Sequence, residues 1–173
     1  MMTTKFNRPS WDTLFMRQAA DLAEKSTCIR KQVGAILVKD NRPISLGYNG
    51  TPKGDAHCCD HGWDVKELRK LLAGAKVSQE FLKQHGEWSK LNELHAERNA
   101  ILYCARRGIA TEGATLYITL SPCHQCAMDI LIAGIKRVVY GELYDRETSG
   151  IVFLSSRGVQ MELLPRATWD RPR

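Results

Sequence analysis

Apolar residues along the chain switch between helical spacing and short continuous runs, a pattern typical of a domain built from alternating helices and strands. Near the N-terminus the apolar positions recur every three or four residues, at Leu14, Phe15, Ala19, Leu22 and Ala23. This spacing predicts an amphipathic helix. Ser10 lies directly before Trp11 and can cap a helix that begins there.

Short apolar runs predict the strands. Residues 33–38 and 44–48 form the first two, with a turn expected at 41–43 because Asn and Pro favour turns. Further along, we expect strands at 114–120, 136–140 and 159–164 and helices at 97–107, 123–133 and 151–156. Gly108 and Gly134 follow two of these helices and suit their ends.

The order of these elements predicts an α/β fold with three α/β/α layers around a central mixed five-stranded sheet. The first two strands are joined by a short turn and should be antiparallel, whereas strands joined through helices should be parallel. We expect one domain over residues 1–173, with an insertion at about 60–92. That segment is polar, with short helices and too few large apolar residues for a core of its own.

Composition narrows the class of protein. The 173 residues are 43% hydrophobic and 25% charged, as in ordinary globular domains. There is no apolar run at the N-terminus, and the run at 130–135 is too short to cross a bilayer, so we expect a cytoplasmic protein without a membrane partner. In a reducing compartment, the six cysteines suit metal ligands or buried thiols better than disulfides.

Two short motifs carry the chemistry: His95-Ala96-Glu97 at the start of one expected helix, and Pro122-Cys123-His124-Gln125-Cys126 at the start of the next. Cysteines three apart at a helix start present both sulfurs on one side. The helix N-terminus favours their thiolate form. Two thiolates and one imidazole make a Zn²⁺ site with three protein ligands and a fourth position for water, which is typical of catalytic zinc.

Glu97 makes this arrangement specific. Residues two apart do not share a face within a helix, so His95 and Glu97 converge only if the metal lies beyond the helix end. Zinc lowers the pKa of a bound water to roughly 7. Glu97 can then take a proton from the attacking water and pass protons on to the substrate and to the departing group.

The pattern His-x-Glu followed by Pro-Cys-x-x-Cys is the signature of zinc nucleobase deaminases. The chain resembles the cytidine deaminase-like superfamily over nearly its whole length and, within it, the phage-type deoxycytidylate (dCMP) deaminases. The similar stretches are 28–35 (CIRKQVGA), 47–51 (GYNGT), 57–60 (HCCD), 87–100 (EWSKLNELHAERNA) and 119–126 (TLSPCHQC). The resemblance implies His95, Cys123 and Cys126 as ligands, Glu97 as the proton carrier, and dCMP as the substrate converted to dUMP for thymidylate synthesis.

The resemblance also implies regulation and assembly. In the family the Gly-Tyr-Asn-Gly loop, here Gly47, Tyr48, Asn49 and Gly50, lies at a nucleotide-binding and regulatory surface. We therefore expect activation by dCTP and inhibition by dTTP, with Mg²⁺ accompanying the triphosphate, and a homo-oligomer, with a hexamer favoured. From the residues alone, the glycines on either side of Tyr48-Asn49 can let the backbone approach a phosphate or sugar. A plain turn at the end of a strand is an equal interpretation of this loop.

Substrate contacts are expected from four residues. Asn49 can supply an amide to the sugar or base, and Arg30, next to Lys31, is placed to meet a phosphate, although a solvated basic pair is an equal alternative. Ser121 precedes the Pro-Cys pair. Tyr144 follows a strand and can border the pocket, although a core or surface role is common for an aromatic residue.

The resemblance implies a second, structural Zn²⁺ held by Cys28, Cys58, His85 and Glu93. These positions are scattered, and their spacing alone would not identify them, but their side chains suit a closed four-ligand zinc site. Such a site would pin the insertion to the sheet. His57, Cys59 and His61 lie near enough in sequence to replace one of the ligands, while Cys104 is expected to be a buried thiol and His124 a surface residue.

Two other functions remain open. A deaminase of transfer RNA or single-stranded DNA would use the same zinc chemistry, and the net charge of +6 favours it mildly. No run of basic residues interleaved with aromatics marks a groove for a nucleic-acid strand, so no nucleic-acid partner is expected. The alternative of another class is a non-catalytic zinc module that binds nucleotides.

Overall fold

The computed structural model describes residues 8–144 and 147–170. Its centre is a five-stranded sheet with the strand order β2-β1-β3-β4-β5. The strands are β1 (Gly34–Lys39), β2 (Arg42–Tyr48), β3 (Thr115–Leu120), β4 (Arg137–Glu142) and β5 (Gln160–Leu163). Strand β1 pairs antiparallel with β2 and β3, whereas β3, β4 and β5 are parallel to one another. The sheet is therefore mixed, as the sequence predicts.

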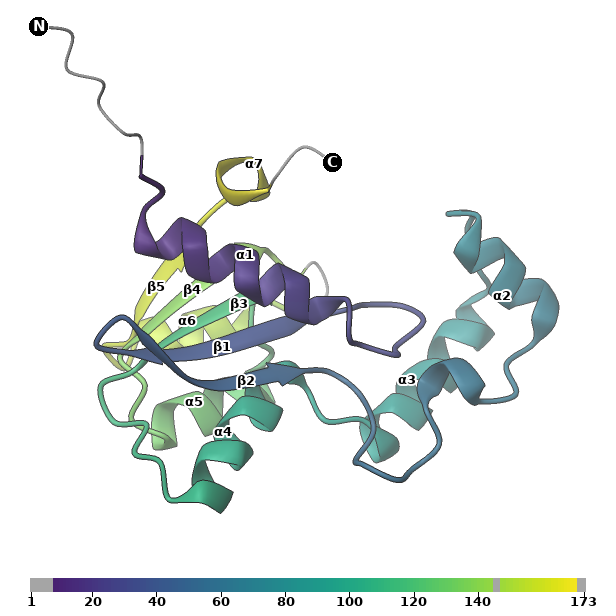
Figure 1. Ribbon diagram of the computed structural model, residues 1–173. Coiled ribbons are helices and arrows are strands. Elements are labelled where there is room, and N and C mark those ends of the chain that lie inside the picture. Colours follow the sequence, from purple (N-terminus) through teal and green to yellow (C-terminus); the bar gives the residue numbers. More distant parts are fainter. Residues whose placement is uncertain (1–7, 145–146, 171–173) are drawn as a thin grey trace, which may run out of the picture.

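Helices cover both faces of the sheet (Figure 1). On one face lie α1 (Trp11–Ala23) and the short α7 (Arg166–Trp169), which the sequence pattern does not predict. On the other face lie α4 (Ala96–Arg107), α5 (His124–Ile132) and α6 (Ser149–Ser155). The expected α/β/α fold class is thus confirmed. None of the helices within residues 8–144 and 147–170 is long and apolar enough to span a membrane.

Two apolar clusters, one on each face, hold these layers together. Neighbouring residues of a strand point to opposite faces, so Ile36 packs under α1 with Phe15, whereas Leu37 packs against α4 and α5 with Ala100 and Ile130. These five side chains are 0–2% exposed. Burial of both faces fixes the register of β1, because a one-residue slip would exchange the two sets.

The hairpin between β1 and β2 differs from the expected turn at 41–43. Asp40 and Asn41 form the turn, both with positive φ, of 52° and 56°, and Arg42 and Pro43 already belong to β2. Aspartate and asparagine tolerate this left-handed conformation better than most residues. Pro43 is compatible with β2 because β2 is an edge strand, where a missing N–H can face solvent.

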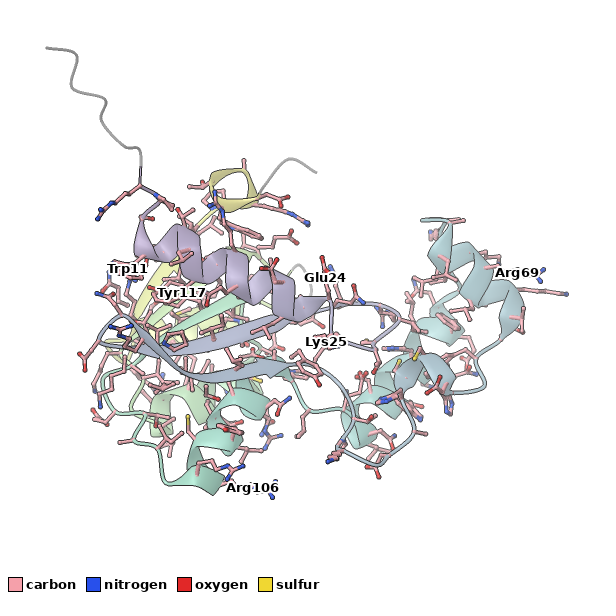
Figure 2. All side chains as sticks on the ribbon, in the orientation of Figure 1. Trp11, Glu24, Lys25, Arg69, Arg106 and Tyr117 are labelled. Atoms are coloured by element: carbon pink, nitrogen blue, oxygen red, sulfur yellow. The ribbon has the colours of Figure 1, made fainter. Side chains whose placement is uncertain are left out.

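A polar network joins α1 to the start of β4 and to β5. Arg137 donates two hydrogen bonds of 2.8 Å to the carboxylate of Asp12, one to each oxygen, and a third of 2.6 Å to Glu162. The Tyr117 hydroxyl donates to Asp12 at 2.6 Å, and Figure 2 shows Tyr117 between α1 and the sheet. The network therefore fastens α1 to the sheet at its N-terminal end.

The segment expected as an insertion projects to one side of the sheet (Figure 1). It contains a 3-10 helix, η1 (Cys58–Asp60), and helices α2 (Val65–Leu72) and α3 (Gln79–Asn92). Arg69 points outward from α2, away from the sheet (Figure 2). The segment has a small apolar cluster, in which Trp63, Val77 and Phe81 pack with the two cysteines Cys28 and Cys58. One of these, Cys28, comes from outside the segment.

Candidate active site

The two sequence motifs meet at the N-terminal ends of α4 and α5. His95 is the N-cap residue of α4, and Cys123 is the N-cap residue of α5. The Nδ1 atom of His95 lies 3.5 Å from the Cys123 sulfur and 3.3 Å from the Cys126 sulfur. Cys126 is fully buried, whereas His95 is exposed. The three ligand atoms therefore converge at a point that solvent can reach.

These distances fit a zinc ion. Tetrahedral zinc, with Zn–S bonds of about 2.3 Å and Zn–N bonds of about 2.0–2.1 Å, separates sulfur and nitrogen ligands by about 3.6 Å. The sulfur–nitrogen distances of 3.3 and 3.5 Å lie close to this value. Cys126 and the His95 ring lower the pKa of the Cys123 thiol to about 4, which favours the thiolate form that metals bind. The site thus offers three suitable ligands and room for a fourth.

Glu97 lies beside this group, as catalysis requires. It is in the first turn of α4, is 4% exposed, and its carboxylate interacts with the Cys126 thiol. Burial raises the pKa of Glu97 to about 7. A carboxyl group with such a pKa can both accept and donate a proton near neutral pH.

The four positions of the expected second site also converge. The Nε2 atom of His85 lies 3.7 Å from the Cys28 sulfur and 3.4 Å from the Cys58 sulfur. Ligand atoms of these residues and of Glu93 all lie within 4.8 Å of one another. The four come from separate segments, namely the loop after α1, η1, α3 and the residue after α3. Their convergence provides a closed set of two sulfurs, one nitrogen and one carboxylate oxygen.

The chemistry of this second group fits a metal ion. Oε1 of Glu93 is buried with no hydrogen-bond partner, although Oε2 accepts a 2.5 Å hydrogen bond from Ser89. Burial raises the pKa of Glu93, and Cys58 and the His85 ring lower the pKa of Cys28 to about 4. A cation among these atoms would satisfy the carboxylate oxygen and the thiolate together.

The three residues that could replace a ligand lie elsewhere. His57 contacts the Thr51 hydroxyl, and the Cys59 thiol is exposed and donates to Asp60. The His61 ring lies against Trp63 with 4.3 Å between ring centroids and an angle of 60° between the ring planes. All six cysteines are free, and Cys104 is fully buried within α4.

A cavity of about 640 Å³ extends along both groups. Its wall includes all four expected substrate contacts, Asn49, Arg30, Ser121 and Tyr144. The Ser121 hydroxyl accepts a 2.8 Å hydrogen bond from the backbone N–H of Tyr144, which ties the loop after β4 to the cavity. The volume is in the range of small-molecule sites.

Asn49 has a structural task in addition to lining this cavity. Its side-chain oxygen accepts from the Val33 N–H at 2.8 Å, and its side-chain nitrogen donates to the Lys31 carbonyl at 2.9 Å. The amide therefore fixes the segment that carries Arg30 and Lys31. One N–H of the amide is not used by these two bonds and can face a ligand.

The loop at 47–50 corrects one physical argument from the sequence. We expected both glycines to let the backbone approach a phosphate or sugar. A Cβ at Gly47 would instead lie 2.2 Å from the Ala96 carbonyl oxygen and 2.8 Å from the Ala100 nitrogen, so the space beside Gly47 is occupied by α4. Gly50 has more room, with only Thr27 within 4 Å. Gly47 is required for strand–helix packing.

Sequence reasoning missed several residues around the cavity. Asn99, one turn beyond His95 on α4, donates to the Tyr48 carbonyl at 2.9 Å. The Glu147 carboxylate accepts from the backbone N–H of His124 at the start of α5. Lys90 on α3 lines the cavity. The position of Asn99 within the His-x-Glu helix is a usable signal, whereas Glu147 and Lys90 have no local pattern that marks them.

Comparisons with known proteins agree with this geometry. Residues 9–142 match the family model of the cytidine and deoxycytidylate deaminase zinc-binding region. The chain is 40% identical to deoxycytidylate deaminase of Enterobacteria phage T4, over 87% of this chain and 88% of that protein. It is 38% identical to ComE operon protein 2 of Bacillus subtilis, over 90% of this chain and 71% of that protein.

A solved structure also resembles this one. It is the dCMP deaminase of cyanophage S-TIM5 in complex with dCMP and dUMP, with a TM-score of 0.70 and 31% sequence identity. The match covers 91% of this chain and 98% of the cyanophage chain.

Proposed function

Because this chain belongs to the family of cytidine and deoxycytidylate deaminases with a zinc-binding region, we propose that it hydrolyses dCMP to dUMP and ammonia. The observation that carries this proposal is the convergence of His95, Cys123 and Cys126 beside the buried carboxylate of Glu97. The relatives in phage T4 and cyanophage S-TIM5 are named for this activity. The dUMP formed would supply thymidylate synthesis.

His95, Cys123 and Cys126 would hold the catalytic Zn²⁺. When bound, zinc acidifies a water molecule and so supplies a nucleophile at neutral pH. Glu97 accepts a proton from the water that attacks C4 of the cytosine ring and gives one to ring N3. Glu97 then accepts the second proton of that water, from the new hydroxyl group on C4, and gives it to the amino group, so that the C4–N bond breaks and ammonia leaves. Water supplies the oxygen, so no oxidant or reductant is needed.

Burial makes Glu97 suited to this task. A carboxyl group with a pKa of about 7 gives up and recovers a proton with little energetic cost near neutral pH. Solvent-exposed glutamate titrates near pH 4, where the protonated form needed to deliver protons would be rare at pH 7. The low exposure of Glu97 therefore supports its role as the proton carrier.

Substrate contacts come from the cavity wall. Arg30, with Lys31 beside it, is the proposed partner of the 5′-phosphate, since both cations line the cavity and Asn49 holds the neighbouring backbone at Lys31 and Val33. Asn49 offers its remaining amide N–H to the sugar or base, and Ser121 and Tyr144 border the base. The cavity suits a single nucleotide in size.

The second group, Cys28, Cys58, His85 and Glu93, is proposed to hold a structural Zn²⁺. Four protein ligands fill a tetrahedral site, and the cysteine pair joins the insertion to the loop after α1. Elemental analysis of the purified chain should find about two zinc ions per chain. One ion per chain would refute the second site and leave the catalytic proposal intact.

Regulation is proposed at the loop formed by Gly47, Tyr48, Asn49 and Gly50. Hydrogen bonds hold this loop next to the active site and support the proposed role: the Asn49 side chain accepts from Val33, Tyr48 accepts from Asn99, and Gly50 pairs with Leu94. We expect activation by dCTP, with Mg²⁺ bound to the triphosphate, and inhibition by dTTP. The proposed state is a cytoplasmic homo-oligomer, a hexamer by family resemblance, and the six free cysteines suit that reducing compartment.

A substrate comparison tests the proposed activity. The zinc-loaded chain is assayed with dCMP, with deoxycytidine and with a cytosine-containing single-stranded oligonucleotide, and uracil products are quantified by chromatography. We expect dCMP to give the highest kcat/KM. A higher value for the oligonucleotide would refute the mononucleotide proposal and favour a nucleic-acid deaminase. No product from any substrate would favour a non-catalytic module.

A further inference from the structure

The segment Glu93-Leu94-His95 carries one ligand of each proposed metal centre. Glu93, with φ −109° and ψ 139°, and His95, with φ −71° and ψ 155°, are both in extended conformation. In extended backbone, residues two apart point to the same side. Both side chains accordingly line the same cavity, about which the two centres are arranged. Along the chain, only Leu94 therefore lies between a ligand of one centre and a ligand of the other.

Hydrogen bonds fix the backbone of residues 93–95 at both ends and in the middle. The Glu93 N–H donates to the Ser89 carbonyl at the end of α3, and the Asn99 N–H donates to the His95 carbonyl at the start of α4, both at 2.9 Å. Between them, Leu94 forms an antiparallel bridge with Gly50, with N–O distances of 2.9 and 3.1 Å. A shift of the Glu93 backbone must therefore move the backbone of His95.

The direction of the Glu93 side chain depends on what the second centre holds. One carboxylate oxygen accepts from Ser89, while Oε1 is buried and without a hydrogen-bond partner. Oε1 shares its surroundings with the sulfurs of Cys28 and Cys58. Without a cation these electron-rich atoms repel one another, and a buried unpaired carboxylate oxygen is costly. A cation turns this repulsion into attraction and holds Glu93 in place.

We infer that the second metal centre positions His95 for the catalytic one, so that zinc binding at the two centres is positively coupled through residues 93–95. This inference rests on the two zinc sites of the proposed function. His95 lines the cavity and is exposed, so its orientation needs support from the backbone. The second centre supplies that support.

Thermodynamic linkage gives the inference a quantitative signature. If an empty second centre weakens zinc binding at the catalytic centre by some factor, an empty catalytic centre must weaken zinc binding at the second by the same factor. Couplings between sites in proteins commonly amount to about 5- to 150-fold, and we expect about tenfold here. A segment that only joins two independent sites would give a factor of one.

The experiment measures zinc affinity, apart from catalysis. Zinc is titrated against a chromophoric chelator for the whole chain, for Cys58→Ser, which disables the second centre, and for Cys126→Ser, which disables the catalytic one. Cys59→Ser is the matched control, because Cys59 is adjacent to Cys58 but exposed and outside both groups. We expect zinc binding at the intact centre to weaken by about tenfold in each ligand variant and to be unchanged in the control.

The variant Leu94→Gly distinguishes coupling through residues 93–95 from a general loss of folding caused by Cys58→Ser. It keeps every ligand but adds backbone freedom between Glu93 and His95. In this background, adding Cys58→Ser should change the affinity of the catalytic centre by less than about threefold. An unchanged tenfold effect there would overturn the inference, because the coupling would not pass through residues 93–95.

Other results also overturn it. These are unaltered catalytic-site affinity in Cys58→Ser, unaltered second-site affinity in Cys126→Ser, or a single zinc ion in the whole chain. Failure of the proposed function would be seen differently: the chain would bind two zinc ions with coupled affinities but form no dUMP.

Discussion

Adding one methyl group at Gly47 should disturb both the fold and the site. The Cβ of Gly47→Ala would lie 2.2 Å from the Ala96 carbonyl oxygen, whereas ordinary contact begins at 3.4 Å. The obstacle is the backbone of α4, which cannot rotate away as a side chain can. Helix α4 must therefore move from β2 by about 1 Å, or β2 must move by a similar distance.

The expected losses of stability and of reaction rate follow from the position of α4, which packs on β2 and has His95 and Glu97 at its start. Overpacking of this kind costs about 1–3 kcal/mol of the free energy of unfolding. Glu97 is in the first turn of α4 and His95 is its N-cap, so the same shift displaces both relative to the cysteines on α5. Misplacement of reacting groups by about 1 Å can cost roughly 10²-fold in rate.

The assay combines urea unfolding with kcat/KM for dCMP. Gly62→Ala is the matched control, since a Cβ at Gly62 has no atom within 4 Å, and it should resemble the unmodified chain in both measurements. We expect Gly47→Ala to lose stability and activity together. Unchanged stability and basal activity, with only the response to dCTP or dTTP altered, would refute the packing argument and favour a purely regulatory role for Gly47.

The remaining predictions concern α1, the insertion and the second centre. Hydrogen bonds from Arg137 hold the pKa of Asp12 below its ordinary value of 3.8, so the stabilisation that Asp12 provides is complete above about pH 4 and is lost as the pH falls through the lowered pKa. Asp12→Asn should therefore reduce the free energy of unfolding at pH 7 and have a smaller effect at pH 3; an equal effect in urea unfolding at both pH values would contradict this. Trp63→Phe removes the 2.7 Å hydrogen bond from the indole to the Cys58 carbonyl and should cost about 1–3 kcal/mol of stability, with zinc lost mainly from the second centre. Equal loss of zinc from both centres, or no loss of zinc, would contradict a role of Trp63 restricted to the second centre.

The sequence was sufficient to predict most of the sheet and its helices. The central strands β1, β3 and β4 are largely buried on both faces, so they appear as continuous apolar runs. Residues such as Ser10 and Gly108 mark helix ends through local hydrogen bonding and backbone preference. The turn at Asp40 and Asn41 was misplaced because Pro43 resembled a turn residue. Its place on an edge strand depends on the whole sheet.

The two metal groups differ in how far local sequence could identify them. His95, Cys123 and Cys126 come from two compact motifs at helix starts, where helical geometry fixes the direction of the side chains. Cys28, Cys58, His85 and Glu93 come from four segments, and only family resemblance connected them in advance. Likewise, the partners Asp12 and Arg137 are 125 residues apart, so no local pattern could pair them.

A paired measurement on Glu97→Ala tests the central account most directly: zinc content by elemental analysis and dUMP formation from dCMP on the same sample. Glu97 is not among the ligand atoms that converge on either proposed ion, so the variant should keep its zinc and its fold while kcat falls by at least about 10²-fold. Activity close to that of the unmodified chain, with zinc still bound, would contradict the assignment of Glu97 as the proton carrier.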